Sequence, residues 1–156
     1  MAIEFVRPFK ENIAIAAFVY NLTDYVSWPQ KPSTIKLCFM NSDDIFKEAE
    51  RIYKESNYKY NYLLKKIDDM NQISGEACNL LYIDSNNKIL LEDLILKLNS
   101  KPILTVSGTH NFAKLGGAVE FNFKDGQVSM IINLRHLKPT QLKIDAELLD
   151  MVELIR

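Results

Sequence analysis

Cysteine, glycine and proline are all scarce in this chain of 156 residues, which has 2 Cys, 5 Gly and 5 Pro. These low counts exclude a disulfide-dense scaffold, a collagen-like repeat and a low-complexity chain. An excess of one charge is also lacking, because 19 Lys and Arg oppose 20 Asp and Glu. The sequence has no basic footprint, so we expect neither nucleic acid nor an anionic membrane surface as a partner.

Long apolar runs are absent as well. The longest nearly unbroken run, residues 13–22, has about half of the ~20 residues that cross a bilayer, so we expect no direct membrane insertion. Polar residues follow this run where a secretory signal would have a small-residue cleavage site, so we interpret it as a buried helix. The opening Met-Ala-Ile-Glu-Phe resembles the start of a truncated chain from which a signal peptide is missing.

Hydrophobic residues make up 47% of the chain. At this length a folded chain removes roughly two thirds of its surface from water, so a core can form without a metal or a dense set of disulfides. No linker or repeat divides the sequence, and we predict a single domain over residues 1–156.

Apolar periodicity predicts strands that alternate with helices over the first two thirds of the chain. A first helix, which carries Ile15 to Val26 on its apolar side, ends before Trp28-Pro29, since a residue that precedes proline avoids helical geometry. Further strands are predicted over 33–40, 58–67, 77–83 and 103–107, with helices over 43–52 and 86–100.

The last third is predicted to form a hairpin, with strands over 118–123 and 127–134, and a closing helix over 145–155. This order of elements indicates an α/β fold. We predict a three-layer sandwich, in which a mostly parallel sheet is flanked by helices on both faces and carries an antiparallel hairpin near the C-terminus.

Motifs for catalysis are missing from the sequence. It has no Gly-rich phosphate loop and no nucleophile elbow, and His110 and His136 are not at the spacing of metal ligands. We therefore expect no enzyme activity, no metal and no cofactor.

A receiver-like phosphoacceptor is the catalytic alternative. Asp43 and Asp44 follow one predicted strand, Asp84 ends another, and Thr105 and Ser107 end a third, so a parallel sheet would place all five at its carboxyl edge. Carboxylates there could hold Mg²⁺ and accept a phosphoryl group. We favour the structural interpretation, in which Asp43 caps a helix and Asp84 begins a turn.

The two cysteines, Cys38 and Cys78, lie on predicted buried strands. Such cysteines are commonly reduced in a cytosolic protein and paired in an exported one. If neighbouring parallel strands carry them near opposite ends, their Cα atoms exceed the ~7 Å limit for a bridge, whereas a register offset or an early start of the later strand permits one. The residues alone leave both states open.

Five segments, taken in order and spacing over residues 13–155, resemble the YfiR family. They read AAFVYNLTDYVSWP, IKLCFMNSDDIF, ACNLLYI, PILTVSGTHNFAKLGGAVEFNF and VSMIINLRHLKPTQLKIDAELLDMVELI. The resemblance implies an exported, periplasmic regulator without catalytic activity. It also implies that Cys38 and Cys78 form a disulfide, while the second cysteine pair of some relatives has no counterpart here.

The resemblance further implies two partners. The first is the periplasmic sensor region of a membrane diguanylate cyclase, which family members bind and hold inactive, so that cyclic-di-GMP and biofilm formation fall. The second is an outer-membrane lipoprotein that relieves this repression. Trp28, His110 and Phe112 are candidates for a partner or ligand surface, and a packed aromatic anchor and a loop are the structural alternative.

Two other hypotheses follow from the sequence. The chain could be a periplasmic module that binds a small ligand. It could also form a homodimer, because small regulators with apolar surface helices often pair, although no coiled-coil heptad is present.

Overall fold

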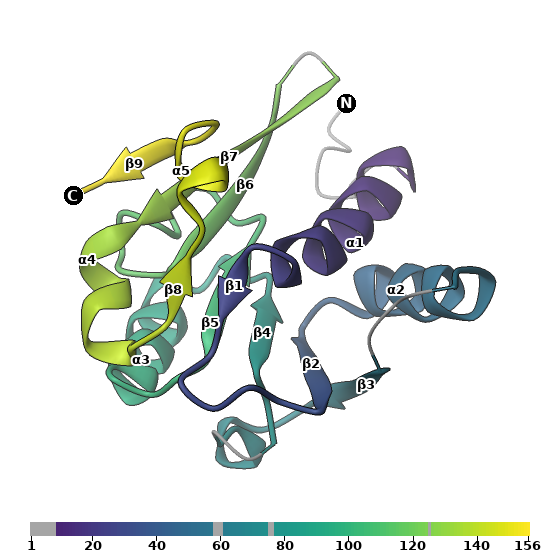
Figure 1. Ribbon diagram of the computed structural model, residues 1–156, viewed down its shortest axis with the longest axis horizontal. Coiled ribbons are helices and arrows are strands. Elements are labelled where there is room, and N and C mark those ends of the chain that lie inside the picture. Colours follow the sequence, from purple (N-terminus) through teal and green to yellow (C-terminus); the bar gives the residue numbers. More distant parts are fainter. Residues whose placement is uncertain (1–8, 58–60, 75–76, 125) are drawn as a thin grey trace.

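A seven-stranded sheet forms the centre of the protein, and helices cover both of its faces (Figure 1). The computed structural model describes residues 9–57, 61–74, 77–124 and 126–156. The strand order is β3-β2-β4-β5-β6-β7-β9, and neighbouring strands are parallel except for the antiparallel pair β6 and β7. The predicted fold class is confirmed.

The elements have the following bounds. The strands of the large sheet are β2 (Thr34–Met40), β3 (Asn61–Ile67), β4 (Leu80–Ile83), β5 (Leu104–Ser107), β6 (Val119–Lys124), β7 (Gln127–Asn133) and β9 (Glu153–Ile155). The α-helices are α1 (Phe9–Thr23), α2 (Asp43–Glu55), α3 (Lys88–Leu98), α4 (Leu134–Leu137) and α5 (Ala146–Leu149). Single 3-10 turns lie at Met70–Gln72 and Lys138–Thr140, and a small antiparallel sheet pairs β1 (Val26–Ser27) with β8 (Lys143–Ile144). The predicted beginning of β3, at 58–60, lies outside the described residues.

Two helices lie on opposite faces of the large sheet because the chain changes direction between them. It passes from β2 through α2 to β3 on one side of β2, and later from β4 through α3 to β5 on the other side. Parallel crossovers are right-handed, so connections that run in opposite directions place their helices on opposite faces. The change of direction lies between the neighbouring strands β2 and β4.

The core has one part on each face of the sheet. Leu80 and Tyr82 of β4 pack with α1 and α2, and Leu81 and Ile83 of the same strand pack with α3. This alternation is the period-2 pattern of a strand that is covered on both faces. On the first face, the hydroxyl of Tyr20 in α1 donates to a backbone oxygen of α2 at 2.6 Å, which fixes the two helices together.

The prediction of a closing helix over 145–155 is wrong beyond its first turn. α5 ends at Leu149, and Glu153–Ile155 forms β9, in which Leu154 pairs with Ile132 of β7. The outer edge of β7 offers backbone groups that need partners, and a segment with Val152 and Ile155 suits a strand. β9 therefore forms this edge of the sheet, next to the strand β7 of the predicted hairpin.

The first helix is also shorter than predicted. α1 ends at Thr23, and Val26 belongs to β1, where it pairs with Ile144 of β8. The backbone N–H of Asp145 donates to the carbonyl of Tyr25 at 2.8 Å. These bonds bring the C-terminal segment beside the end of α1.

Candidate functional site

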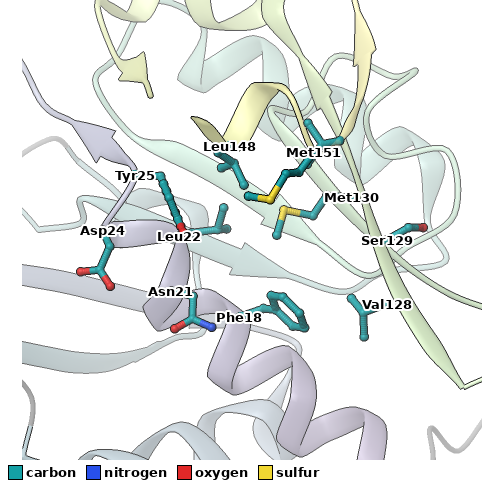
Figure 2. A pocket seen from close by; sticks show the side chains of 11 residues that line it. Phe18, Asn21, Leu22, Asp24, Tyr25, Val128, Ser129, Met130, Leu148 and Met151 are labelled. Carbon is teal, nitrogen blue, oxygen red and sulfur yellow. The ribbon is translucent and has the colours of Figure 1, made fainter. Parts of the chain in front are cut away.

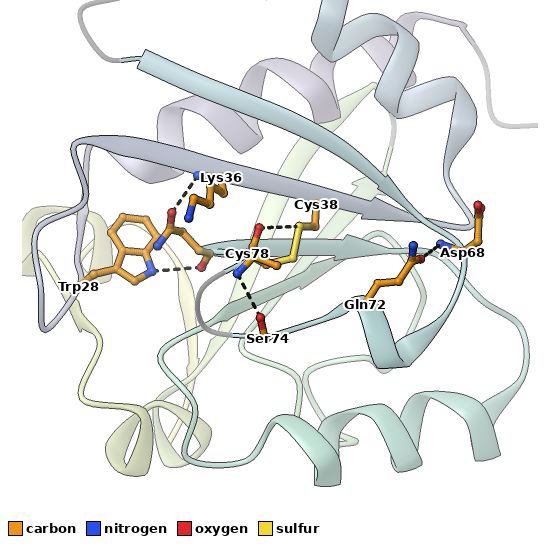
Figure 3. Close-up of a disulfide and its surroundings, with 9 residues drawn as sticks. Trp28, Lys36, Cys38, Asp68, Gln72, Ser74 and Cys78 are labelled. Atoms are coloured by element: carbon orange, nitrogen blue, oxygen red, sulfur yellow. Dashed lines mark hydrogen bonds between the residues drawn. A yellow bond between two sulfur atoms is a disulfide. The ribbon is translucent and has the colours of Figure 1, made fainter.

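Cys38 and Cys78 form a disulfide, and their Cα atoms are 5.8 Å apart (Figure 3). Cys38 lies in β2, and Cys78 lies just before the neighbouring strand β4. If the β2–β4 register continued backwards, Cys78 would lie opposite Ile35, about 10 Å along the strand from Cys38. The chain turns there instead, and the backbone N–H of Cys78 donates to the carbonyl of Ser74 at 3.0 Å. This turn before β4 supplies the geometry that the sequence left open.

The disulfide is completely buried. Both cysteines are 0% exposed, and they belong to the part of the core that α3 covers. It joins β2 to the residues just before its neighbour β4, the two strands between which the chain changes direction. We infer that the bond has a structural role and that reductants reach it only when the domain opens.

Trp28 is a packed anchor beside this region. Its indole N–H donates to the carbonyl of Asn79 at 3.0 Å, and the side-chain oxygen of Asn79 accepts from the backbone N–H of Lys36 at 2.8 Å (Figure 3). The ring is half-buried and lines an open cavity of about 680 Å³ together with Pro102 and Gln141. Trp28 thus ties the segment after α1 to Asn79, the residue before β4, and stays partly exposed.

Asp84 lies at the carboxyl edge of the sheet, as predicted, and internal hydrogen bonds engage its carboxylate. It accepts from the backbone N–H of Gly108 at 3.1 Å and from the hydroxyl of Tyr82 at 3.1 Å. The hydroxyl of Thr109 accepts from the backbone N–H of Ser85 at 3.1 Å. These bonds join the end of β4 to the loop after β5, which agrees with the structural interpretation of Asp84.

Two other residues of the receiver-like hypothesis, Asp43 and Thr105, contact groups other than Asp84. Asp43 is exposed, begins α2, and lies 3.4 Å from the ammonium group of Lys66. Thr105 is fully buried and accepts from the backbone N–H of Ala118 at 2.9 Å. In the described part of the chain, no cluster of three or more His, Cys, Asp or Glu side chains could hold a metal ion.

The loop after β5 separates two of the predicted surface residues. His110 is exposed at the loop, whereas Phe112 is 0% exposed and packs into the α3 side of the core. The ring of Phe112 therefore belongs to the core and not to a surface that a partner could touch. Trp28 lies where β4 begins, at the other end of the strands, so the three residues do not form one surface.

Glu120 was not singled out from the sequence, and it organises this loop. It is 1% exposed, and its two carboxylate oxygens accept from the backbone N–H groups of Asn111 at 3.3 Å and Ala113 at 2.9 Å. The side chain of Asn133 donates to the carbonyl of Ala113 at 2.7 Å. The signal in the sequence is a glutamate between Val119 and Phe121, at a strand position whose neighbours are buried on both faces.

We expect a Glu120→Gln change to loosen the loop, because the amide nitrogen of glutamine cannot accept a hydrogen bond from a backbone N–H. One of the two loop donors then loses its buried acceptor, which costs about 1–3 kcal/mol of folding free energy. Hydrogen exchange should accelerate at Asn111 and Ala113, with little change in β2 and β4. Unchanged exchange at both amides would contradict this role.

His136 is a second buried polar residue that the sequence did not explain. It is 8% exposed, and among the described residues its Nε2 atom has no hydrogen-bond partner. Burial lowers the pKa of His136, because apolar surroundings disfavour the charged imidazolium. Its backbone N–H donates at 3.2 Å to the side chain of Asn133, the residue that caps the start of α4.

A family model described as YfiR/HmsC-like matches residues 14–153. The chain belongs to the YfiR/HmsC-like family. Membership is consistent with a periplasmic regulator, and the family is in general regulatory and non-catalytic. A search of curated proteins found no match.

The fold of this YfiR/HmsC-like chain is similar to that of a solved structure, described as a conserved domain protein from Vibrio cholerae O1 biovar El Tor. The TM-score is 0.57 at 10% sequence identity, and the match covers 93% of this chain and 60% of that chain. At this identity the likeness concerns the fold alone, and this chain spans only 60% of the length of the other.

The disulfide bears on the compartment of this family member. The disulfide fits an oxidising compartment such as the periplasm. A search of the described ranges found no helix with both the length and the hydrophobicity that crossing a membrane requires.

Proposed function

We propose that this protein is a non-catalytic periplasmic regulator that binds the periplasmic sensor region of a membrane diguanylate cyclase and holds the cyclase inactive. Less cyclic-di-GMP and less biofilm are the expected results. An outer-membrane lipoprotein that competes for the regulator would relieve the repression.

The observation that carries this proposal is the family match over residues 14–153, which spans almost the whole domain. The buried disulfide supports export, because such bonds persist in oxidising compartments. The bonds of Asp84 to Gly108 and Tyr82 support a structural role for the residue that the competing phosphoacceptor hypothesis requires.

Deleting the gene in its host should raise cyclic-di-GMP severalfold and increase biofilm, because the cyclase loses its repressor. Mass spectrometry of extracted nucleotides measures the effect directly. A plasmid copy with an export signal should restore the low level, whereas the same copy without the signal should not.

A strain that lacks both the regulator and its cyclase provides the control, and its cyclic-di-GMP should stay low. Unchanged nucleotide levels after deletion, in a strain in which both proteins are detected, would overturn the proposal.

A further inference from the structure

A groove with a volume of about 390 Å³ opens between α1, the hairpin end of β7 and the segment that follows β8 (Figure 2). Figure 2 shows Phe18 and Leu22 of α1 facing Met130 of β7, while Leu148 of α5 and Met151 close the opposite side. The bond between Asp145 and Tyr25 and the β1–β8 pair hold these walls in place. The groove is therefore a built feature of the fold.

The floor of the groove is apolar, and one of its walls is exposed. Leu22 and Leu148 are 1% and 4% exposed, Met130 is half-buried, and Met151 is 65% exposed. Methionine is flexible and polarizable, so it adapts to different apolar side chains at binding surfaces. A large exposed apolar side chain beside an apolar hollow favours contact with a partner.

Asp24 is the one charged residue among the described residues that line the groove, and the chain beside it is mostly acidic, with Lys143 and Arg156 just outside the segment 144–155. The two segments that form most of its walls, residues 11–30 and 144–155, contain no Lys or Arg. They carry exposed carboxylates at Asp24, Asp145, Glu147 and Asp150. The third wall is formed by β7. The basic residue beside it is Lys124 of β6, which lies at the hairpin end, opposite Gln127. An occupant with positive charges around an apolar stripe complements this pattern.

We propose that the groove binds an amphipathic helix of the partner, with apolar side chains along one face and Lys or Arg beside them. The contacting groups of this protein are side chains on the face of the sheet and on two helical segments, which suits a helix that places residues at i, i+3, i+4 and i+7 into a groove. This inference rests on the proposed function, because it assigns the helix to the periplasmic region of the cyclase.

Two synthetic peptides of about 18 residues, roughly five helical turns, test the chemistry with purified protein. One has Leu at helical spacing and Lys elsewhere, and the other has Glu in place of every Lys. Titration calorimetry should show that the Lys peptide binds and the Glu peptide does not, and added salt should weaken the binding. Equal binding of both peptides would overturn the charge argument.

Matched variants locate the site. Met151→Gln should weaken binding of the Lys peptide about tenfold, because the apolar contact of the exposed wall is lost. Leu96→Gln is the control, since Leu96 of α3 is 74% exposed on the opposite face of the sheet. Asp150→Asn should weaken binding, and Asp93→Asn, on α3, should leave it unchanged. If the Met151→Gln and Leu96→Gln variants bind the Lys peptide equally well, the groove is not the site that binds the peptide.

The same variants separate this inference from the proposed function in cells. Met151→Gln should raise cyclic-di-GMP towards the level of the deletion strain, and Leu96→Gln should repress normally. Normal repression by Met151→Gln would overturn the groove and leave the regulator intact. Unchanged cyclic-di-GMP in the deletion strain would overturn the proposed function, and with it the assignment of the helix to a cyclase. The peptide titration would still test the chemistry of the groove.

Discussion

Replacing Cys38 and Cys78 with alanine should lower the free energy of unfolding by about 4 kcal/mol. The two cysteines are 40 residues apart in the sequence, and removing the disulfide returns the conformational entropy of that loop to the unfolded chain. Typical domains have about 5–15 kcal/mol of stability in total, so this loss is a large share. Urea unfolding followed by circular dichroism gives the midpoint and slope for the wild type and the double variant.

Reductant provides the internal control for this experiment. A thiol reductant should lower the midpoint of the wild type and leave that of the double variant unchanged. Because both cysteines are 0% exposed, reduction of the native protein should be slow and should accelerate in mild urea. Equal midpoints for the oxidised wild type and the double variant would show that the bridge does not stabilise this fold.

The disulfide also shows where sequence analysis of this fold succeeds and where it stops. Buried strands around Cys38 and before Asp84 follow from their apolar runs, and the alternation of strands and helices indicates the fold class. The distance between Cys38 and Cys78 depends on a turn at Ser74, which has no periodic signal. A resemblance to a family indicated the pairing, and the local pattern did not.

The C-terminal segment shows a different limit. Leu148, Leu149, Val152 and Ile155 have helical spacing, but the outer edge of β7 offers backbone partners that a helix would leave unused. A distant strand thus decides the structure of residues 153–155. The groove has the same origin, because its walls come from segments that are about 100 residues apart in the sequence and meet only in the folded chain.

Buried polar residues are the hardest part of the candidate site to predict. Glu120 lies in a strand with apolar neighbours, and an alternating pattern would place it in solvent. In the structure its carboxylate instead accepts hydrogen bonds from two backbone N–H groups of the loop that follows β5. Phe112 was a candidate for a partner or ligand surface, yet this loop turns its ring inwards and buries it completely.

The inward ring of Phe112 leads to the second large expected effect, that of a Gly117→Ala change. A Cβ atom at Gly117 would lie 2.1 Å from Cε2 and 2.4 Å from Cδ2 of the Phe112 ring. Gly117 also donates its backbone N–H to the carbonyl of Phe112 at 3.0 Å, so the loop cannot simply widen. The ring is fully buried in a close-packed core. We expect the free energy of unfolding to fall by about 3 kcal/mol, at the upper end of overpacking effects.

A double-variant cycle distinguishes this contact from a general intolerance of the loop. Phe112→Leu removes the ring edge that the new methyl group meets, so Gly117→Ala should cost much less in that background than in the wild type. Gly126→Ala is the comparison at another glycine. A Cβ atom there would meet no described atom within 4 Å, so its main cost is the backbone strain of a φ of 78°. Strictly additive losses in the Phe112 and Gly117 variants would show that Gly117 is required for some reason other than the ring, since two changes that share one contact must couple.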